Sequence, residues 1–198
     1  MSRFDSDENT KEDKAGESEA FFQKLLKTRT LLVSGEIDKG LAEKTIRGLL
    51  LLEAEGDAPI KIFIDSPGGD VDAGYAIIDM MKFVGPEVWT VGMGLVASAG
   101  ALVLLGAPKG HRVGLPHSHY LIHQPLSGLR GVATDIEIHA RELEKVRERI
   151  NGFIADETGK PLDQVVKDTD RDFWMNAEDA LAYGLLSGIV ARRSEFPV

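Results

Sequence analysis

Ser98 is the residue of this sequence whose setting best suits nucleophilic chemistry. It lies in the stretch Gly94–Gly100, after a predicted strand and at the start of a predicted buried helix. Small neighbours permit a sharp turn that exposes the hydroxyl, and a helix N-terminus offers unpaired N–H groups to a developing oxyanion. This is the logic of a nucleophile elbow, although Val96 departs from the G-x-S-x-G pattern. The competing interpretation is a serine that only permits close helix packing.

A nucleophilic serine needs a base, and the base needs an acid that orients it. His123 follows a predicted strand and precedes Gln124 and Pro125, so it lies at a strand end, where sites on such sheets gather. Asp172 stands before the apolar pair Phe173 and Trp174. Taken alone, Asp172 is better explained as an ordinary loop carboxylate. The three residues are candidates for the nucleophile, base and orienting acid of a hydrolase.

Two other groups of residues invite a functional interpretation. His117, His119 and His123 lie close enough in sequence to share a strand face, but the spacing is not that of a zinc site, so no metal is expected. Gly68 and Gly69 follow the predicted strand Ile60–Asp65. A glycine pair lets an anion or a substrate backbone approach closely, although a plain turn explains it equally well.

Composition narrows the classes of protein. The 198 residues carry a formal net charge of −9, and seven acidic and three basic side chains lie among the first 20. A nucleic-acid binder would need clustered basic residues, and a membrane span would need about 20 apolar residues in a row. The chain has no cysteine, which excludes disulfides and fits a cytoplasmic protein. Residues 1–19 are expected to form a disordered acidic tail, and residues 20–198 a single domain.

The pattern beyond Phe21 alternates strands and helices and predicts a mostly parallel α/β sheet covered by helices. The predicted strands are Thr30–Val33, Ile60–Asp65, Glu87–Val91, Arg112–Leu115 and His119–Ile122. The predicted helices run from Asp38 to near Gly56, from about Asp72 to Phe83, from Ala97 to Leu105, and from a cap at Asn176.

One further helix is predicted from Ala133 to about Thr158, with an apolar stripe along it. Its 26 residues, at about 1.5 Å each, would make a rod of about 39 Å, long for a domain of this size. Part of it is therefore expected to project and to pack on another subunit. On this view Leu143, Val146 and Ile150 are buried only between subunits. An amphipathic surface helix is the alternative.

Read together, these segments resemble the ClpP family, the proteolytic subunits of ATP-dependent Clp proteases. The matching stretches are Ile64–Gly69, Met93–Gly100, Leu121–Leu126, Ala133–Glu142 and Asp170–Asp172, and the likeness runs from about Phe21 to Val190. The intervals from Ser98 to His123 and from His123 to Asp172 match the family's as well.

The resemblance implies a crotonase-like fold of ββα units with a protruding handle helix. It implies a serine endopeptidase, with Ser98 as nucleophile, His123 as base and Asp172 as orienting acid. The N–H groups of Gly68 and Ala99 would form the oxyanion hole. No cofactor is implied.

The resemblance also implies how substrate and neighbouring subunits bind. A substrate peptide would lie extended between Gly68–Asp70, with contacts to Gly69 and Asp70, and the segment at Pro125 and Leu126. Two stacked heptameric rings would meet through the handle helix, with Asp170 and Arg171 at the ring contact. Peptides and unfolded proteins would be the substrates, fed by a AAA+ Clp ATPase.

The sequence departs from the family at several positions. Ala99 stands where methionine is usual, Leu95 and Val96 replace smaller or more polar residues, and Phe173 and Trp174 add bulk beside Asp172. Residues 1–19 lack the family's apolar N-terminal stretch, which leaves the ATPase partnership open. Two alternatives also remain: a crotonase-type acyl-CoA enzyme and a non-catalytic ring subunit.

Overall fold

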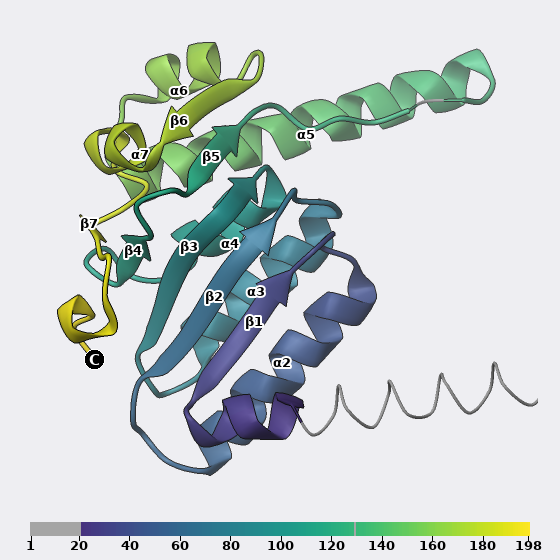
Figure 1. Cartoon of the computed structure of the whole chain (residues 1–198). Helices are drawn as coiled ribbons and strands as arrows, with labels where there is room; N and C mark the ends of the chain where they lie inside the picture. The colour runs from purple at the N-terminus through teal and green to yellow at the C-terminus, as the bar shows by residue number, and fades with distance from the viewer. Residues whose placement is uncertain (1–20, 129) are drawn as a thin grey trace, which may run out of the picture.

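The computed structural model describes residues 21–128 and 130–198, so the tail expected over residues 1–19 lies outside the described residues (Figure 1). Residues 21–27 are helical. The elements that follow are β1 (Thr30–Ser34), α2 (Lys39–Ala54), β2 (Ile60–Ser66), α3 (Val71–Phe83), β3 (Val88–Ala97), α4 (Ala99–Leu105), β4 (Arg112–Gly114), β5 (His119–Ile122), α5 (Ala133–Thr158), α6 (Leu162–Asp168), β6 (Phe173–Asn176), α7 (Ala177–Tyr183) and β7 (Gly188–Ile189).

The sheet is mostly parallel, as the alternating pattern predicts. Strands β1, β2, β3, β4 and β7 pair in that order, and all these pairs are parallel. Helices α2, α3 and α4 lie together against one face of the sheet (Figure 1). Alternate residues of β2 are buried beneath them, and α4 is buried along its whole length. The main core therefore lies between this sheet face and these helices.

Strand β3 is longer than the expected Glu87–Val91, because it serves two neighbours in succession. Residues Thr90–Gly92 pair with β4, and Leu95–Ala97 pair with β5. The strand bends between these halves at Gly94, which has a φ of 55° and lies against the carboxylate of Asp65. Asp65 Oδ1 also accepts the N–H of Leu95 at 3.0 Å, and this bond carries the strand past the bend. The extension delivers the chain to Ser98 at the far end of the sheet.

Helix α5 has the predicted bounds and ends at Gly159, whose φ of 78° is the left-handed conformation that glycine favours. Its N-terminal half extends beyond the body of the molecule (Figure 1), and its residues up to Glu142 are exposed. Its C-terminal half packs on the core. Ile150 is only 4% exposed in the single chain, and Val146 is partly buried against the core, so the expectation that these two are buried only between subunits is wrong.

The region after α5 contains elements that the sequence pattern did not predict, among them helix α6 and strands β6 and β7. Strand β6 pairs antiparallel with β5, and α6 packs on α5. The predicted cap of the following helix is confirmed, since the Asn176 side chain accepts the N–H of Asp179 at 2.8 Å. Among the described residues, no helix has the length and apolarity to cross a membrane.

Candidate active site

Ser98 lies at the junction of β3 and α4, in a backbone conformation that side-chain-bearing residues rarely adopt. Its φ is 55° and its ψ is −123°, and such strain persists where the surrounding structure enforces it. Its N–H donates to the carbonyl of Leu121 at 2.9 Å, and its carbonyl accepts from Ala101 and Leu102. In the described part of the chain, its hydroxyl makes no capping bond to α4 and so remains free for chemistry.

Gly68 packs against the Ser98 turn so closely that only glycine fits. A Cβ built on Gly68 would lie 2.6 Å from Ser98 Cβ and 2.9 Å from the nitrogen of Ala99. Its φ of 96° also requires a glycine. The two predicted oxyanion residues, Gly68 and Ala99, are therefore neighbours.

The N–H of Gly68 is already engaged, because it donates to Ser66 Oγ at 3.1 Å. It could bind an oxyanion only by releasing this bond. Gly69, the next residue, lines the pocket beside Ser98. Ala99 begins α4, where backbone N–H groups lack partners within the helix.

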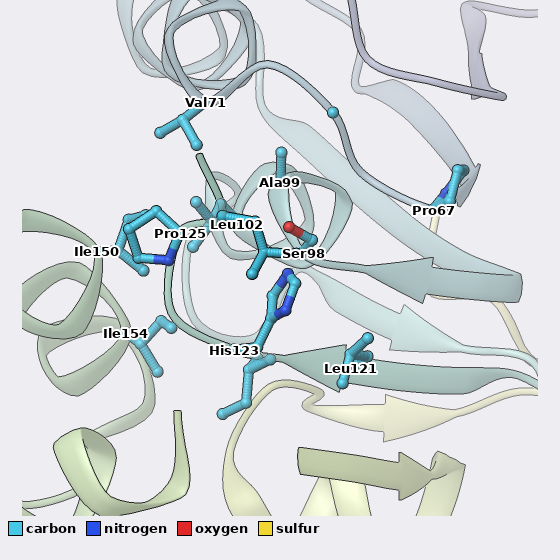
Figure 2. A pocket seen from close by; sticks show the side chains of 13 residues that line it. Pro67, Val71, Ser98, Ala99, Leu102, Leu121, His123, Pro125, Ile150 and Ile154 are labelled. Carbon is cyan, nitrogen blue, oxygen red and sulfur yellow. The ribbon is translucent and has the colours of Figure 1, made fainter. Parts of the chain in front are cut away.

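His123 follows the last residue of β5, and its ring points toward Ser98 (Figure 2). Its Nδ1 lies 3.3 Å from Asp172 Oδ1. The β5–β6 ladder explains this pairing: Ile122 pairs with Phe173, so one further step of the antiparallel register places His123 opposite Asp172. The side chain of His123 is 13% exposed and that of Asp172 is 61% exposed.

The segment before Asp172 is fixed to the same end of β5. The backbone N–H of Gln124 donates to the carbonyl of Thr169 at 2.6 Å, and its side-chain amide donates to the carbonyl of Asp170, also at 2.6 Å. Asp170 lies 3.6 Å from Arg147 of α5, and Arg171 is exposed. Gln124, Thr169 and Arg147 thus support the loop that carries Asp172, although the sequence pattern assigned them no function.

A largely apolar pocket of about 250 Å³ opens beside Ser98 and His123 (Figure 2). Apolar side chains from the helices around the site form its walls. These are Val71 of α3, Leu102 of α4, and Ile150 and Ile154 of α5. Such a pocket suits an apolar side chain of a ligand held next to the hydroxyl. The contribution of α5 to this wall was missed at the sequence level, where its stripe was assigned to a subunit contact.

Of the residues predicted to bind substrate, Gly69, Pro125 and Leu126 line this pocket, and Leu126 is 82% exposed. Asp70 has a structural role as well: its side chain caps α3 by accepting the N–H of Ala73 at 2.8 Å. Its own N–H donates to the carbonyl of Ile37 at 2.7 Å. These two bonds hold the segment between Gly69 and Val71, which both line the pocket, to α3 and to Ile37.

Across residues 21–128 and 130–198, no three His, Cys, Asp or Glu side chains are arranged to hold an ion. His111 instead stacks on Trp89, with ring centroids 4.2 Å apart.

Comparison with known proteins places this chain in a family. A family model described as Clp protease matches residues 12–193. The chain is 60% identical over 184 residues to the ATP-dependent Clp protease proteolytic subunit 2 of Treponema pallidum, which covers 92% of each chain. It is 50% identical over 171 residues to proteolytic subunit 3 of Rhizobium meliloti, covering 86% of this chain and 88% of that one.

Solved structures agree with the sequence relatives. The structure of a ClpP1 mutant from Listeria monocytogenes superposes with a TM-score of 0.82 at 48% identity, covering 88% of this chain and 98% of that one. The predicted α/β fold with a long handle helix is thereby confirmed.

Proposed function

Because the chain belongs to the Clp protease family and is a peptidase subunit of that family, we propose that Ser98, His123 and Asp172 are its catalytic triad. One observation carries the assignment. The strained Ser98 turn and His123 line one pocket, and the His123 ring is paired with Asp172 at 3.3 Å. A structural serine would need neither the backbone strain nor an oriented imidazole beside it.

In the proposed mechanism, Ser98 Oγ attacks the carbonyl carbon of the scissile peptide bond while His123 takes the hydroxyl proton. Asp172 accepts a hydrogen bond from Nδ1 and so fixes the tautomer that leaves the other ring nitrogen free to act as base. His123 then gives the proton to the leaving amine. An acyl-enzyme on Ser98 remains, and water releases it by the same steps in reverse order.

The oxyanion formed in both steps would be bound by two backbone N–H groups, one at the start of α4 and one in the loop between β2 and α3. Ala99 supplies one of them, and its position at a helix N-terminus favours negative charge. Gly68 is the proposed second donor, and it would exchange its bond to Ser66 for the stronger bond to the oxyanion.

Substrate would lie extended between the segment at Gly69 and Asp70 and the segment at Pro125 and Leu126. Backbone pairing of this kind tolerates many sequences, as degradation of peptides and unfolded proteins requires. The side chain before the scissile bond would enter the apolar pocket. Its walls, which include Leu102, Ile150 and Ile154, favour an apolar residue there.

The chain would act as part of an assembly. Residues 20–198 would form one domain that assembles into two stacked heptameric rings, with the exposed half of α5, Asp170 and Arg171 at the ring contact. The relatives are named as subunits of an ATP-dependent protease, so an AAA+ ATPase is the proposed source of unfolded substrate. Such an enclosed site would spare folded proteins.

A labelling experiment tests the chemistry. The purified chain should react with a fluorophosphonate and cleave fluorogenic peptides, and Ser98→Ala should abolish both. Cleavage of an unfolded protein with and without a Clp ATPase tests the partnership separately. Labelling that survives in Ser98→Ala would overturn the assignment of the nucleophile.

A further inference from the structure

Three charged side chains meet at the C-terminal end of α5, far along the helix from its exposed half. Glu157, on the last turn of α5, forms ion pairs with Arg112 of β4 and with Lys82 of α3. The Lys82 contact measures 2.8 Å. We call Glu157, Arg112 and Lys82 the Glu157 cluster. It joins three elements that are separate in sequence.

Arg112 is the most deeply buried member of the cluster, at 1% exposed. Its Nε donates to the carbonyl of Ala107 at 2.7 Å, and its Nη1 donates to the carbonyl of Glu157 at 2.9 Å. The Glu157 carbonyl belongs to the last turn of a helix, where carbonyls lack intrahelical partners and a cation is favoured. Arg112 therefore binds both the side chain and the backbone of the helix end.

Lys82 attaches the same helix end to α3. Besides its bond to Glu157, its ammonium group lies 5.1 Å from the centre of the Phe153 ring. Phe153 in turn packs edge-on against Tyr75 of α3, with ring centroids 5.8 Å apart. Burial alone would raise the pKa of the Glu157 carboxyl, but its bonds to Lys82 and Arg112 hold that pKa below the usual range. The carboxylate is therefore charged and bound at neutral pH.

The residues of α5 that line the active-site pocket lie just before this cluster. Ile154 precedes Glu157 by about one turn and Ile150 by about two turns. Ser98 lies across the pocket, on the β3–α4 junction. The two walls are far apart in sequence, because the chain between them contains β4, β5 and the exposed half of α5. The width and depth of the pocket depend on where α5 sits along its own axis.

We propose that the Glu157 cluster is a positioning device for substrate selection, which holds α5 at the axial position that places Ile150 and Ile154 in the pocket wall. The hydrophobic effect is not directional, so apolar burial alone specifies the axial position of a helix less sharply than hydrogen bonds do. Hydrogen bonds depend steeply on distance and angle, so Arg112 and Lys82 fix the helix end in register. The inference rests on the proposed role of the pocket as the site for the side chain before the scissile bond.

Glu157→Gln tests the proposal by removing the charge while keeping the shape. The readout is the ratio of kcat/KM for a peptide with leucine before the scissile bond to that for a peptide with alanine there. We expect the ratio to fall roughly three- to ten-fold, because the displaced pocket wall loses contacts with the larger leucine side chain and so raises the KM of the leucine peptide. The rate of fluorophosphonate labelling should stay within about two-fold of the parent, because the Ser98 chemistry is untouched.

Lys82→Met is a second variant. Unlike Glu157→Gln, it leaves the buried charge of Arg112 paired with the Glu157 carboxylate. The Lys82 side chain is 47% exposed and methionine is a side chain of similar length, so the fold should persist and the ratio should fall less than in Glu157→Gln. Glu148→Gln, an exposed change on the same helix, is the matched control and should leave the ratio unchanged. An unchanged ratio in Lys82→Met and Glu157→Gln, or an equal loss for both peptides, would overturn the proposal. Loss of labelling in the parent would instead overturn the proposed triad.

Discussion

Gly68 and Ser98 approach each other so closely that a methyl group on the first would lie 2.6 Å from the Cβ of the second. Gly68→Ala should therefore displace the Ser98 turn and cost activity far more than stability. A loss of about 100-fold or more in kcat is expected, comparable to removing an oxyanion donor. Peptide turnover and thermal unfolding measure the two effects.

Gly152→Ala is the matched control for this change. A Cβ at Gly152 meets nothing within 4 Å, and alanine is the better helix former by about 1 kcal/mol. Activity should be kept and the unfolding temperature should rise. If Gly68→Ala were as active as this control, the close contact at Ser98 would have no part in catalysis.

The members of the proposed triad should act as one unit. Ser98→Ala and His123→Ala should each remove most peptidase activity, and the double variant should be little worse than the worse single one. Asp172→Ala should also be severe, because His123 then loses the partner that orients it. Circular dichroism checks that each variant is folded. Losses that multiplied independently would argue against a shared mechanism.

Ala99→Met should change the preference for the residue before the scissile bond more than the overall rate. Ala99 is among the residues that line the pocket, and it offers its backbone N–H whatever its side chain is. A larger residue fills part of the cavity of about 250 Å³, so peptides with bulky side chains should lose most. A panel of peptides varied at that position measures the effect. An unaltered preference would mean that the added side chain points away from the cavity.

Elements with strong local signals could be predicted from the sequence, and those fixed by pairing partners could not. Helix α5 has the predicted ends, because a long amphipathic pattern is closed by Gly159. Strand β3 was predicted too short, because its second half is held by β5 rather than by its own alternation. Strand β6 was missed for the same reason, since its four residues become a strand only against β5.

In the candidate site too, residue types could be predicted from local sequence, whereas contacts set by tertiary structure could not. The residue types of Ser98, His123 and Asp172 could be selected from the sequence, but the reason they meet is the β5–β6 register, a long-range pairing. The hydrogen bond from Gly68 to Ser66 and the placement of Ile150 in the pocket depend on tertiary packing. Ile150 lies on an apolar stripe of the helix, and this pattern is equally compatible with a subunit interface and with packing on the core.

The pH dependence of stability should reveal the charged state of Glu157. Its pKa in the folded chain lies below the ordinary value of 4.5, so in the window just below 4.5 the unfolded chain binds more protons at this site. Its contribution to stability is present above that window and is lost as the pH falls through the folded pKa. The difference in the free energy of unfolding between the parent and Glu157→Gln, measured in urea, should thus be largest at neutral pH and should become smaller in acid. A constant difference would mean that the carboxylate is not the stabilising group.

The exposed half of α5 should carry the contact between subunits. Ile136 and Ile138 are 39% and 54% exposed in the single chain, whereas Ile150 is buried and lines the pocket. Changes at Ile136 and Ile138 can therefore test assembly without disturbing the fold of the subunit, and a change at Ile150 cannot. The double change Ile136→Asp and Ile138→Asp should leave the subunit folded, because both sites already face water. In an assembly it would bury unpaired carboxylates, which costs several kcal/mol per site. Sedimentation should show a smaller particle, and peptide turnover should fall as well, because Asp170 and Arg171, which precede Asp172, are proposed to lie at the ring contact. His139→Asp adds a charge on the same exposed half without removing an apolar contact, and it should keep more of the native mass. A double variant with native mass and native rate would make this half of α5 an ordinary surface helix.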